Sequence, residues 1–308
     1  MSNSLEDKLM KFLNLYWLRP ENGLLMAFKS ENIETMKFES PSLDLSCGDG
    51  MFMFTHLGGT FSNQFDYFKS TSADKFSHDS PTDIYDSFDP DYSPEIISHP
   101  KVKIDYGTDW KQNLLDKASK LNIHDKLILH DNNNKLPFSD NFFKTVYSNS
   151  VYWVDNIDLL LSELHRTLRP DGKIFLQIMT PYHIETLDKL DKLFSKEAID
   201  ILDRNRRKSY MSLKKYDEWV ELFTKSGFKI KETRNSYPNE FILDLWNIGL
   251  RPIAHLLIQM SNALSSEKYL EIKKQWVDIF YKLFKPLLNS PKTYKFEKSP
   301  YILFVLEK

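Results

Sequence analysis

The chain has 308 residues, of which 41% are hydrophobic and 27% are charged, with a formal net charge of −2 at pH 7. This length predicts one core domain of about 200 residues with additional segments. A charge near zero disfavours DNA and makes RNA a weak candidate, because a nucleic-acid surface requires a basic face. The single cysteine, Cys47, excludes a disulfide framework and a cysteine-based zinc site, and fits a reducing, cytoplasmic compartment.

The first 40 residues predict a helical arm ahead of the core. Apolar residues recur at helical spacing from Leu5 to Leu18, Ser4 is available as the N-cap, and Pro20 closes the segment. No basic flank with an apolar run follows Met1, so no secretion signal is expected. No stretch of about 20 uncharged apolar residues occurs, so no transmembrane segment is expected either.

Residues 43–50 read Leu-Asp-Leu-Ser-Cys-Gly-Asp-Gly and predict a buried strand, a tight turn and a helix start. Gly48 and Gly50 can adopt positive φ and let a ligand approach the backbone closely. The following helix would direct its unpaired N–H groups at the same point. The pattern therefore predicts a nucleotide-like cofactor site at the end of the first strand, with a simple turn as the alternative.

The stretch from Asp44 to Gly50 resembles motif I of class I (Rossmann-like, type 11-like) S-adenosylmethionine-dependent methyltransferases. Ser46 stands where that family usually has its first glycine. Further family landmarks follow in order: an acidic strand end near residue 109, a Leu-Pro-Phe stretch at 136–138, a fourth strand at 145–154, and Leu-Arg-Pro-Asp-Gly at 168–172. The resemblance implies an α/β fold with a doubly wound, seven-stranded, mostly parallel sheet, an antiparallel last strand, and S-adenosyl-L-methionine as cofactor.

The resemblance also assigns cofactor-binding residues. Asp109, after a strand at 102–108, would accept hydrogen bonds from both ribose hydroxyls, because a carboxylate is an acceptor only; Asp105 is the fallback. Asp131 would accept from the adenine amino group, with an Asx turn as the alternative. The full predicted set is Asp44, Ser46, Gly48, Gly50, Asp109, Trp110, Asp131, Asn132 and Asn149.

Two insertions interrupt this core. Residues 58–100 contain many aromatic residues and four prolines, and from 61 onward they show no periodicity, which favours a lid beside the substrate site over an inert surface excursion. Residues 238–298 predict two or three helices that form a cap over the site or a homodimer face. The expected organisation is an arm at 1–40, a core at 41–237 and 299–308, and a cap at 238–298.

Candidate acceptor-site residues follow the later strands. His183 leaves strand five at the carboxyl edge of the sheet and is a candidate general base, with Tyr182 as second candidate and simple packing as the alternative. Trp153 would line the substrate site. Arg206 and Arg207 lie in a basic helical stretch that either grips a phosphate or carboxylate or forms a solvated face. No metal site is predicted, because no histidine or acidic spacing supports one.

The expected function is methyl transfer to a small-molecule acceptor, such as a phosphorylated sugar, glycan or lipid intermediate. Many amino-group nucleic-acid methyltransferases have an N/D-P-P-Y/F tetrad after the fourth strand, whereas this chain has Ser148-Asn149-Ser150-Val151 there. This difference favours a small-molecule acceptor over a nucleic acid. Two alternatives are a non-catalytic S-adenosylmethionine-binding sensor or partner subunit, and an RNA methyltransferase. The acceptor, and whether its O, N or C atom is methylated, are not specified by these motifs.

Overall fold

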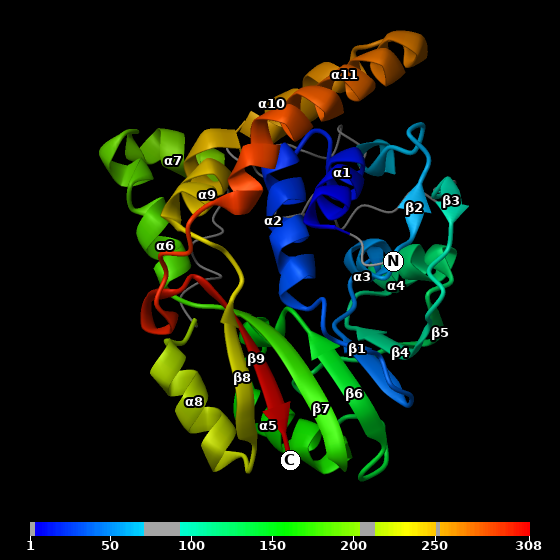
Figure 1. Ribbon diagram of the computed structural model, residues 1–308, viewed down its shortest axis with the longest axis vertical. Helices are drawn as coiled ribbons and strands as arrows, with labels where there is room; N and C mark the ends of the chain where they lie inside the picture. Colours follow the sequence, from blue (N-terminus) through cyan, green and yellow to red (C-terminus); the bar gives the residue numbers. More distant parts are fainter. Residues whose placement is uncertain (1–3, 71–92, 204–212, 251–252) are drawn as a thin grey trace.

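The computed structural model describes residues 4–70, 93–203, 213–250 and 253–308. Its centre is a seven-stranded sheet with the order β5-β4-β1-β6-β7-β9-β8 (Figure 1). Strand β9 runs antiparallel to both of its neighbours, and the other neighbouring strands are parallel. The predicted sheet is thereby confirmed. The strands are β1 (Ser42–Leu45), β4 (Ile104–Asp109), β5 (His124–Leu129), β6 (Phe143–Ser148), β7 (Leu168–Met179), β8 (Lys229–Asn235) and β9 (Tyr301–Glu307).

The central strands are buried on both faces over most of their length, and β9 begins with six consecutive apolar residues. All four residues of β1 are buried, as are the last six of β7 and the first six of β9. Such continuous apolar runs are typical of parallel sheets that helices cover on both sides. The chain forms these strands where apolar residues are consecutive, and it forms helices where they recur at three- and four-residue spacing.

Helix α5 (Ile157–Thr167) illustrates the helical pattern. The side chain of Asn156 caps its first turn by accepting from the N–H of Leu159, and Ile157, Leu160, Leu161 and Leu164 are buried on one face. The other helices are α1 (Leu5–Leu15), α2 (Pro20–Asn32), α3 (Met51–His56), α4 (Gln112–Leu121), α6 (Tyr182–Leu187), α7 (Lys196–Asp203), α8 (Tyr216–Lys225), α9 (Glu240–Asp244), α10 (Ala254–Asn262) and α11 (Ser266–Phe284).

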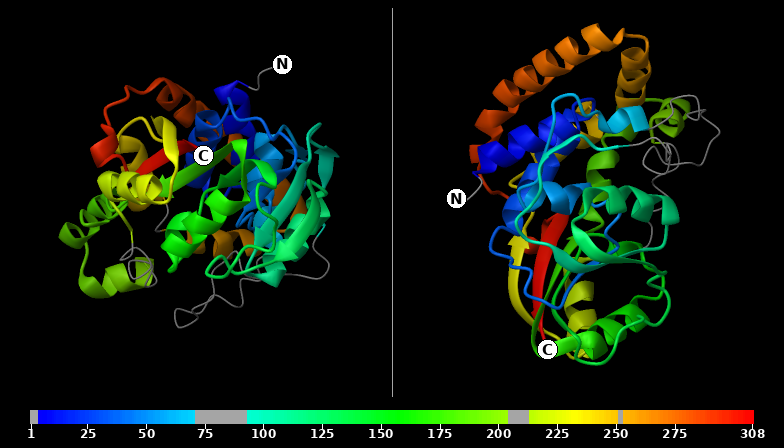
Figure 2. Two further views of the ribbon diagram at one scale, coloured as in Figure 1. Left: turned by 90° about the horizontal axis from the view of Figure 1, so that it is seen from below. Right: turned by 90° about the vertical axis from the view of Figure 1, so that its right-hand side faces the viewer.

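The N-terminal arm consists of two helices that pack on each other. Ser4 is the N-cap of α1, as the sequence predicts, and together with Asp7 it forms a capping box. Pro20 occupies the first turn of α2, so it begins a second helix as well as following the first. Both helices lie above the carboxyl ends of the parallel strands, where ligands of such sheets bind (Figures 1 and 2).

The two insertions contain regular structure. Within the segment predicted to lack it, β2 (Thr60–Phe61) pairs antiparallel with β3 (Ile96–Ser98), and Tyr67–Ser70 forms a 3-10 turn; residues 71–92 lie outside the described ranges. The second insertion forms α9, a π-helical turn (Leu245–Leu250), α10 and α11.

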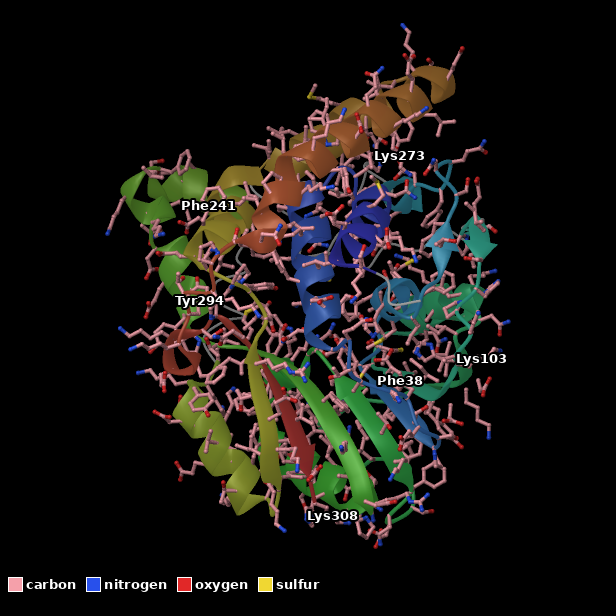
Figure 3. All side chains as sticks on the ribbon, viewed as in Figure 1. Phe38, Lys103, Phe241, Lys273, Tyr294 and Lys308 are labelled. Carbon is pink, nitrogen blue, oxygen red and sulfur yellow. The ribbon has the colours of Figure 1, made fainter. Side chains whose placement is uncertain are left out.

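Helices α9 to α11 of the second insertion lie over the carboxyl edge of the sheet. Phe241 and Lys273 in this insertion are far from Lys308 at the opposite edge (Figure 3). In the part of the chain that is described, no helix combines the length and apolar character needed to cross a membrane. The roles of the two insertions as lid and cap stay predictions.

The strand predicted at 145–154 is shorter than expected. Strand β6 ends at Ser148, where its pairing with β7 ends at Leu176, and Val151–Trp153 then forms a 3-10 turn. The chain turns because the N–H of Trp153 bonds back to the carbonyl of Ser150 at 3.0 Å. Asn149 therefore lies in the loop at the carboxyl edge instead of inside a strand.

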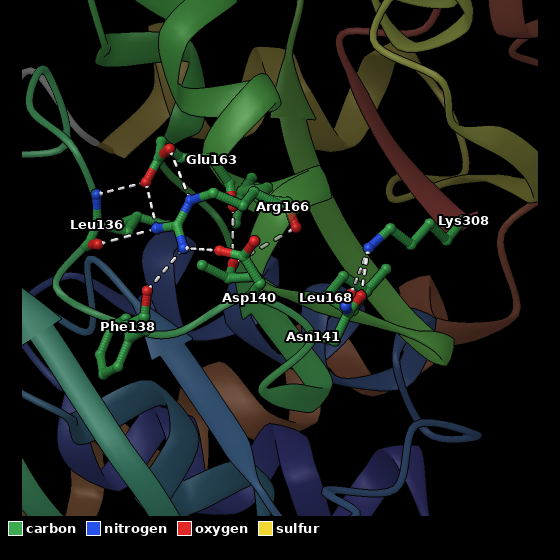
Figure 4. Close-up of polar contacts among 10 residues, drawn as sticks. Leu136, Phe138, Asp140, Asn141, Glu163, Arg166, Leu168 and Lys308 are labelled. Atoms are coloured by element: carbon green, nitrogen blue, oxygen red, sulfur yellow. Dashed lines mark hydrogen bonds and ion pairs between the residues drawn. The ribbon is translucent and has the colours of Figure 1, made fainter.

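The Leu136–Phe138 loop is held by an ion pair on α5 (Figure 4). Arg166 donates to the carbonyls of Phe138 and Leu136 at 2.8 and 3.1 Å and to the Asp140 carboxylate at 2.7 Å. Glu163 is 6% exposed; it accepts from Arg166 at 2.5 Å and from the N–H of Leu136 at 3.0 Å. The Arg166 guanidinium lowers the pKa of Glu163, so the pair is ionised at neutral pH.

We expect Arg166→Met to lower the free energy of unfolding by about 2–3 kcal/mol, because it leaves the Glu163 carboxylate buried without its cation. Urea unfolding at neutral pH measures this change. Arg169→Met is the matched control: its ion pair with Asp171 is 3.4 Å long between exposed side chains, so its cost is at most about 0.5 kcal/mol. Adding Glu163→Gln to Arg166→Met should recover part of the loss. Equal effects of Arg166→Met and Arg169→Met would contradict the assignment.

Candidate functional site

The turn after β1 has the left-handed conformation that its glycines predict. Gly48 has φ +58° and Gly50 has φ +74°, and Gly50 is the N-cap of α3. Ser46 also has positive φ, +58°, which costs a non-glycine residue roughly 1 kcal/mol. The turn thus has the backbone of a glycine-rich loop even where a serine replaces a glycine.

Asp109 lies at the end of β4 beside this turn, where the sequence places it. One carboxylate oxygen, Oδ2, accepts from the N–H of Gly48 at 3.0 Å, and Oδ1 accepts from the N–H of Lys111 at 3.0 Å. Burial raises the pKa of Asp109, and these N–H groups offset part of that rise. Because each carboxylate oxygen can accept a further hydrogen bond, Asp109 can still receive two hydroxyl donors.

The fallback candidate, Asp105, has a structural role. Its carboxylate accepts from the N–H of Ser42 at 2.7 Å and from the hydroxyl of Ser40 at 2.8 Å, near the beginning of β4. Burial acts to raise the pKa of Asp105, but the hydrogen bonds from Ser42 and Ser40 outweigh it and lower the pKa. Asp105 therefore fastens the entry into β1 and lies away from the carboxyl edge.

After β5, Asn132 and not Asp131 contacts the loop. Asn132 is buried, and its Nδ2 donates to the Ser46 hydroxyl at 2.7 Å. Its Oδ1 is buried and has no hydrogen-bond partner within the described residues. Asp131 is exposed and accepts from the N–H of Asn133 at 2.9 Å, which is the Asx turn considered as its alternative role.

Asp44 lies at the base of the loop and contacts β5. Its Oδ2 is 3.1 Å from Nε2 of His124, and the two side chains are 3% and 0% exposed. Asp44 is predicted to bind cofactor, and in this structure its carboxylate faces His124. The pair links β1 to β5 through the interior, across the intervening strand β4.

The described part of the first insertion reaches the loop. The hydroxyl of Tyr67 donates to Oδ2 of Asp49 at 2.5 Å, and Tyr67 is 1% exposed. Its ring packs edge-on against Tyr16 of the arm at 5.5 Å. Nε1 of Trp17 donates to the buried Asp66 carboxylate at 3.0 Å. Sequence reasoning missed Asp49 and Tyr67; the cluster of aromatic residues in the insertion was the available signal.

Three predicted residues lie at the rim of the site. Trp110, directly after Asp109, is 65% exposed, and the ammonium of Lys111 is 5.1 Å from the centre of its ring. Trp153 is 42% exposed, and Asn149 is partly exposed in the loop after β6. An exposed indole next to Asp109 offers a flat apolar surface to a cofactor base.

The acceptor-side candidates lie at the other half of the edge. His183 is fully buried on α6; its ring is 5.6 Å from that of Tyr301 and 5.2 Å from that of Trp246. Tyr182 is partly exposed on the same helix. Arg206 and Arg207 lie outside the described residues.

A buried lysine, Lys29 on α2, lies beside this histidine group and was missed by sequence reasoning. It is 5% exposed, and its ammonium is 4.2 Å from the centre of the Tyr301 ring. Burial lowers the pKa of Lys29 from 10.5 to about 7. Within the described ranges no carboxylate pairs with it. A single lysine on a predicted helix carries no signal that it points inward, because lysines are rarely buried.

A cavity of about 330 Å³ lies elsewhere, between α1, β2 and α11. None of the predicted site residues lines it. In the described segments, no group of three or more His, Cys, Asp or Glu side chains is arranged to hold a metal ion. The cavity lining is Met10, Lys11, Asn14, Thr55, Gly59, Thr60, Phe61, Asn63, Leu270, Lys273, Lys274, Val277 and Asp278.

Comparisons with known proteins agree with the motifs. The family model described as a methyltransferase domain matches residues 98–176. A search of curated proteins finds no match. Among solved structures, a possible histamine N-methyltransferase from Thermotoga maritima has 12% identity and a TM-score of 0.45, over 92% of each chain.

Two further solved structures show the same level of similarity. A putative methyltransferase from Bacillus halodurans has 15% identity and a TM-score of 0.43, over 90% of this chain and 96% of that one. Geranyl diphosphate C-methyltransferase from Streptomyces coelicolor has 10% identity and a TM-score of 0.42, over 91% and 76%. The family-model match confirms the resemblance that the motifs predicted.

The strain at Ser46 can be measured with two substitutions. Ser46→Ala loses the hydrogen bond to Asn132 and keeps the positive φ, whereas Ser46→Gly loses the same bond and relieves the strain. We expect the glycine variant to be about 1 kcal/mol more stable than the alanine variant in urea unfolding. Equal stability of the two variants would mean that the loop does not hold residue 46 at positive φ.

The buried charge of Lys29 should lower stability progressively as the pH falls from about 10.5 to about 7, with the full loss present below about pH 7. A lowering of the pKa from 10.5 to about 7 corresponds to roughly 5 kcal/mol at most. Between these values the unfolded chain binds more protons than the folded one, so stability rises with pH. We expect Lys29→Met to be about 1–4 kcal/mol more stable than the wild type at pH 6, with the difference shrinking toward pH 10.

Urea unfolding at several pH values measures this difference. The exposed Lys268 provides the control: Lys268→Met should change stability little and equally at every pH. A Lys29→Met variant that is less stable than the wild type by the same amount at pH 6 and pH 9.5 would refute a buried, uncompensated ammonium.

Proposed function

We propose that this chain transfers a methyl group from S-adenosylmethionine to a small-molecule acceptor. Its sheet has the order of the methyltransferase-like fold, and its residues 98–176 match the family model of a methyltransferase domain. The observation that carries the proposal is the convergence of three elements at the carboxyl edge. The loop after β1 meets Asp109 at 3.0 Å and Asn132 at 2.7 Å. Ligands of open α/β sheets bind at this edge.

The residues at this point fit the cofactor. A Cβ at Gly48 would meet no atom within 4 Å, so the backbone has open space above it. Asp109 has acceptor capacity for the two ribose hydroxyls, and the unpartnered Oδ1 of Asn132 can accept from the adenine amino group in place of Asp131. The exposed indole of Trp110 is available to stack on the base.

The bound cofactor supplies an electrophilic methyl group on its sulfonium, and the protein has to align the acceptor and exclude water. Alignment of this kind can contribute roughly 7–11 kcal/mol to lowering a barrier. Tyr67 on Asp49 and Trp17 on Asp66 hold the first insertion and the arm against the loop. These two hydrogen bonds support the proposal that the first insertion and the N-terminal arm close over the cofactor site.

The acceptor would lie toward His183, Tyr301 and Trp246. A His183 ring that reaches the acceptor would take the proton of a hydroxyl or amine as the new bond to carbon forms. The aromatic surroundings suit an acceptor with an apolar part. A phosphorylated sugar, glycan or lipid intermediate stays the predicted class, with Arg206 and Arg207 as predicted partners of its phosphate.

Calorimetric titration with S-adenosylmethionine and S-adenosylhomocysteine tests the proposal. We expect micromolar binding by the wild type and about 100-fold weaker binding by Asp109→Ala, because two hydrogen bonds to an ionised group are lost. Asp125→Ala is the control: Asp125 is an exposed carboxylate on the neighbouring strand, and it should not change affinity.

A wild type that binds neither compound would refute the cofactor site. Binding followed by screening of acceptors for methylated mass separates the enzyme from the alternative of a non-catalytic sensor or partner subunit. RNA binding that weakens as salt rises would instead favour the RNA alternative.

A further inference from the structure

The cofactor site does not use the polar groups buried around Tyr301. We propose that Lys29 and Tyr237 bind an oxyanion of the acceptor, a carboxylate or a phosphate monoester carried on an aromatic or other apolar body. This assignment rests on the proposed function, since it names the end of the acceptor that is held. Both residues contact the Tyr301 ring: the Lys29 ammonium at 4.2 Å from its centre, and the Tyr237 ring at 5.0 Å.

Five separate elements bring this cluster together. Lys29 comes from α2, Tyr301 begins β9, and Tyr237 follows β8. His183 on α6 is 5.6 Å from Tyr301, and Tyr152, in the turn after β6, is 6.4 Å from it. The cluster thus extends from the acceptor-side histidine to the loop that follows β6, at the same edge of the sheet as the cofactor loop.

Among the described residues, no carboxylate pairs with the Lys29 ammonium, and the Tyr237 hydroxyl is a donor without an acceptor. Tyr237 is 1% exposed, and its hydroxyl has no hydrogen-bond partner in the described ranges. Burial raises the pKa of Tyr237, so it keeps its proton and remains a donor. An uncompensated buried ammonium and hydroxyl are costly, and an oxyanion would compensate both at once. This combination points to an anionic oxygen ligand and not to a cation.

The backbone around Lys29 is fixed before any ligand binds. The side chain of Gln177 on β7 donates to the carbonyl of Lys29 at 2.9 Å. Asn32, one turn later, donates to the Ser236 hydroxyl at 3.1 Å, and Arg234 donates to the carbonyl of Asn32 at 3.0 Å. Because the backbone that carries the Lys29 side chain is fixed, binding of a ligand costs little backbone conformational entropy there.

In the part of the chain that is described, the titratable groups around Lys29 include no carboxylate paired with it. Tyr301, Tyr237 and His183 face the cluster from β9, the segment after β8 and α6. On its own helix, Glu21 is bound to Arg19 at 2.9 Å, and the Arg19 guanidinium lies 5.8 Å from the Trp246 ring. The carboxylate of that pair is engaged by arginine.

Further aromatic side chains border the cluster on the side toward β6. Tyr152 and Tyr301 line the side toward β6, and Trp153 beside Tyr152 is 42% exposed. An acceptor with its oxyanion on Lys29 would extend its apolar body along these rings toward Asn149 and the cofactor. Such rings provide large apolar contact area with few rotatable bonds, which favours planar or apolar acceptors.

Titration calorimetry of the protein saturated with S-adenosylhomocysteine tests this assignment. Benzoate and phenyl phosphate are the probes, and benzyl alcohol is the neutral control. We expect the wild type to bind at least one anion and not the alcohol. Lys29→Met should bind that anion at least about tenfold more weakly, Tyr237→Phe several-fold more weakly, and Lys29→Arg with nearly full affinity.

A proton count separates recognition by Lys29 from a general packing effect. At about pH 8, titrations in buffers of different ionisation enthalpy should show proton uptake by the wild type, because the anion selects the ammonium form of Lys29. Lys29→Arg should bind without uptake, since arginine is always charged. The exposed-site variant Lys268→Met should behave as the wild type does.

The outcomes distinguish this assignment from the cofactor site. Normal S-adenosylhomocysteine binding with no binding of either anion would overturn the oxyanion site and leave the proposed function standing. Anion binding that is unchanged in Lys29→Met would also overturn it. If Lys29→Met did not fold, the loss in Tyr237→Phe and the absence of proton uptake in Lys29→Arg would decide the question. Failure of S-adenosylhomocysteine itself to bind would refute both.

Discussion

The hydrogen bond from the Gly48 N–H to the Asp109 carboxylate is the constraint on which the site depends. Parallel pairing of β1 with β4, with Asp44 opposite Gly107, brings a glycine turn and a carboxylate to the same edge. The N–H of Cys47 extends this pairing by donating to the Thr108 carbonyl at 2.8 Å. Because β4 ends in an acidic residue beside an open turn, the carboxylate that we propose to bind the ribose is held in place by the protein's own backbone. The pairing register of β1 with β4 therefore determines which backbone N–H groups and which carboxylate meet at the loop.

Lys29 is a second unusual feature of the structure, because its ammonium is buried without a paired carboxylate among the described residues. The protein keeps Lys29 against the Tyr301 ring, where burial lowers its pKa to about 7, although a methionine would fill a similar volume without that cost. Other buried charges have polar partners: Glu163 pairs with Arg166, Glu21 pairs with Arg19, and Lys273 donates to the carbonyls of Asn63 and Phe65. A ligand that supplies an acceptor to Lys29 would give it the partner that these groups have, and buried groups with shifted pKa values are concentrated at functional sites.

Much of the fold follows from local patterns in the sequence. The apolar run of β9 and the spacing of Leu160, Leu161 and Leu164 are set within a few residues, and they predict a strand and a helix. The seven-stranded sheet and the position of Asp109 at a strand end follow from the resemblance to the methyltransferase family. The choice between Asp131 and Asn132 depends on one Asx turn, which no periodicity encodes. Lys29 and Tyr237 are distant in the chain and meet only through Tyr301, so their proximity is a property of the tertiary structure.

The N-terminal arm connects the two halves of the site. Trp17, just past the end of α1, binds Asp66 in the insertion whose Tyr67 contacts the glycine loop, while Lys29 on α2 faces the acceptor cluster. Because α1 and α2 pack along each other, the arm forms one continuous set of contacts from the glycine loop to the acceptor cluster. The same pair of helices therefore supports both the proposed cofactor site and the proposed oxyanion site.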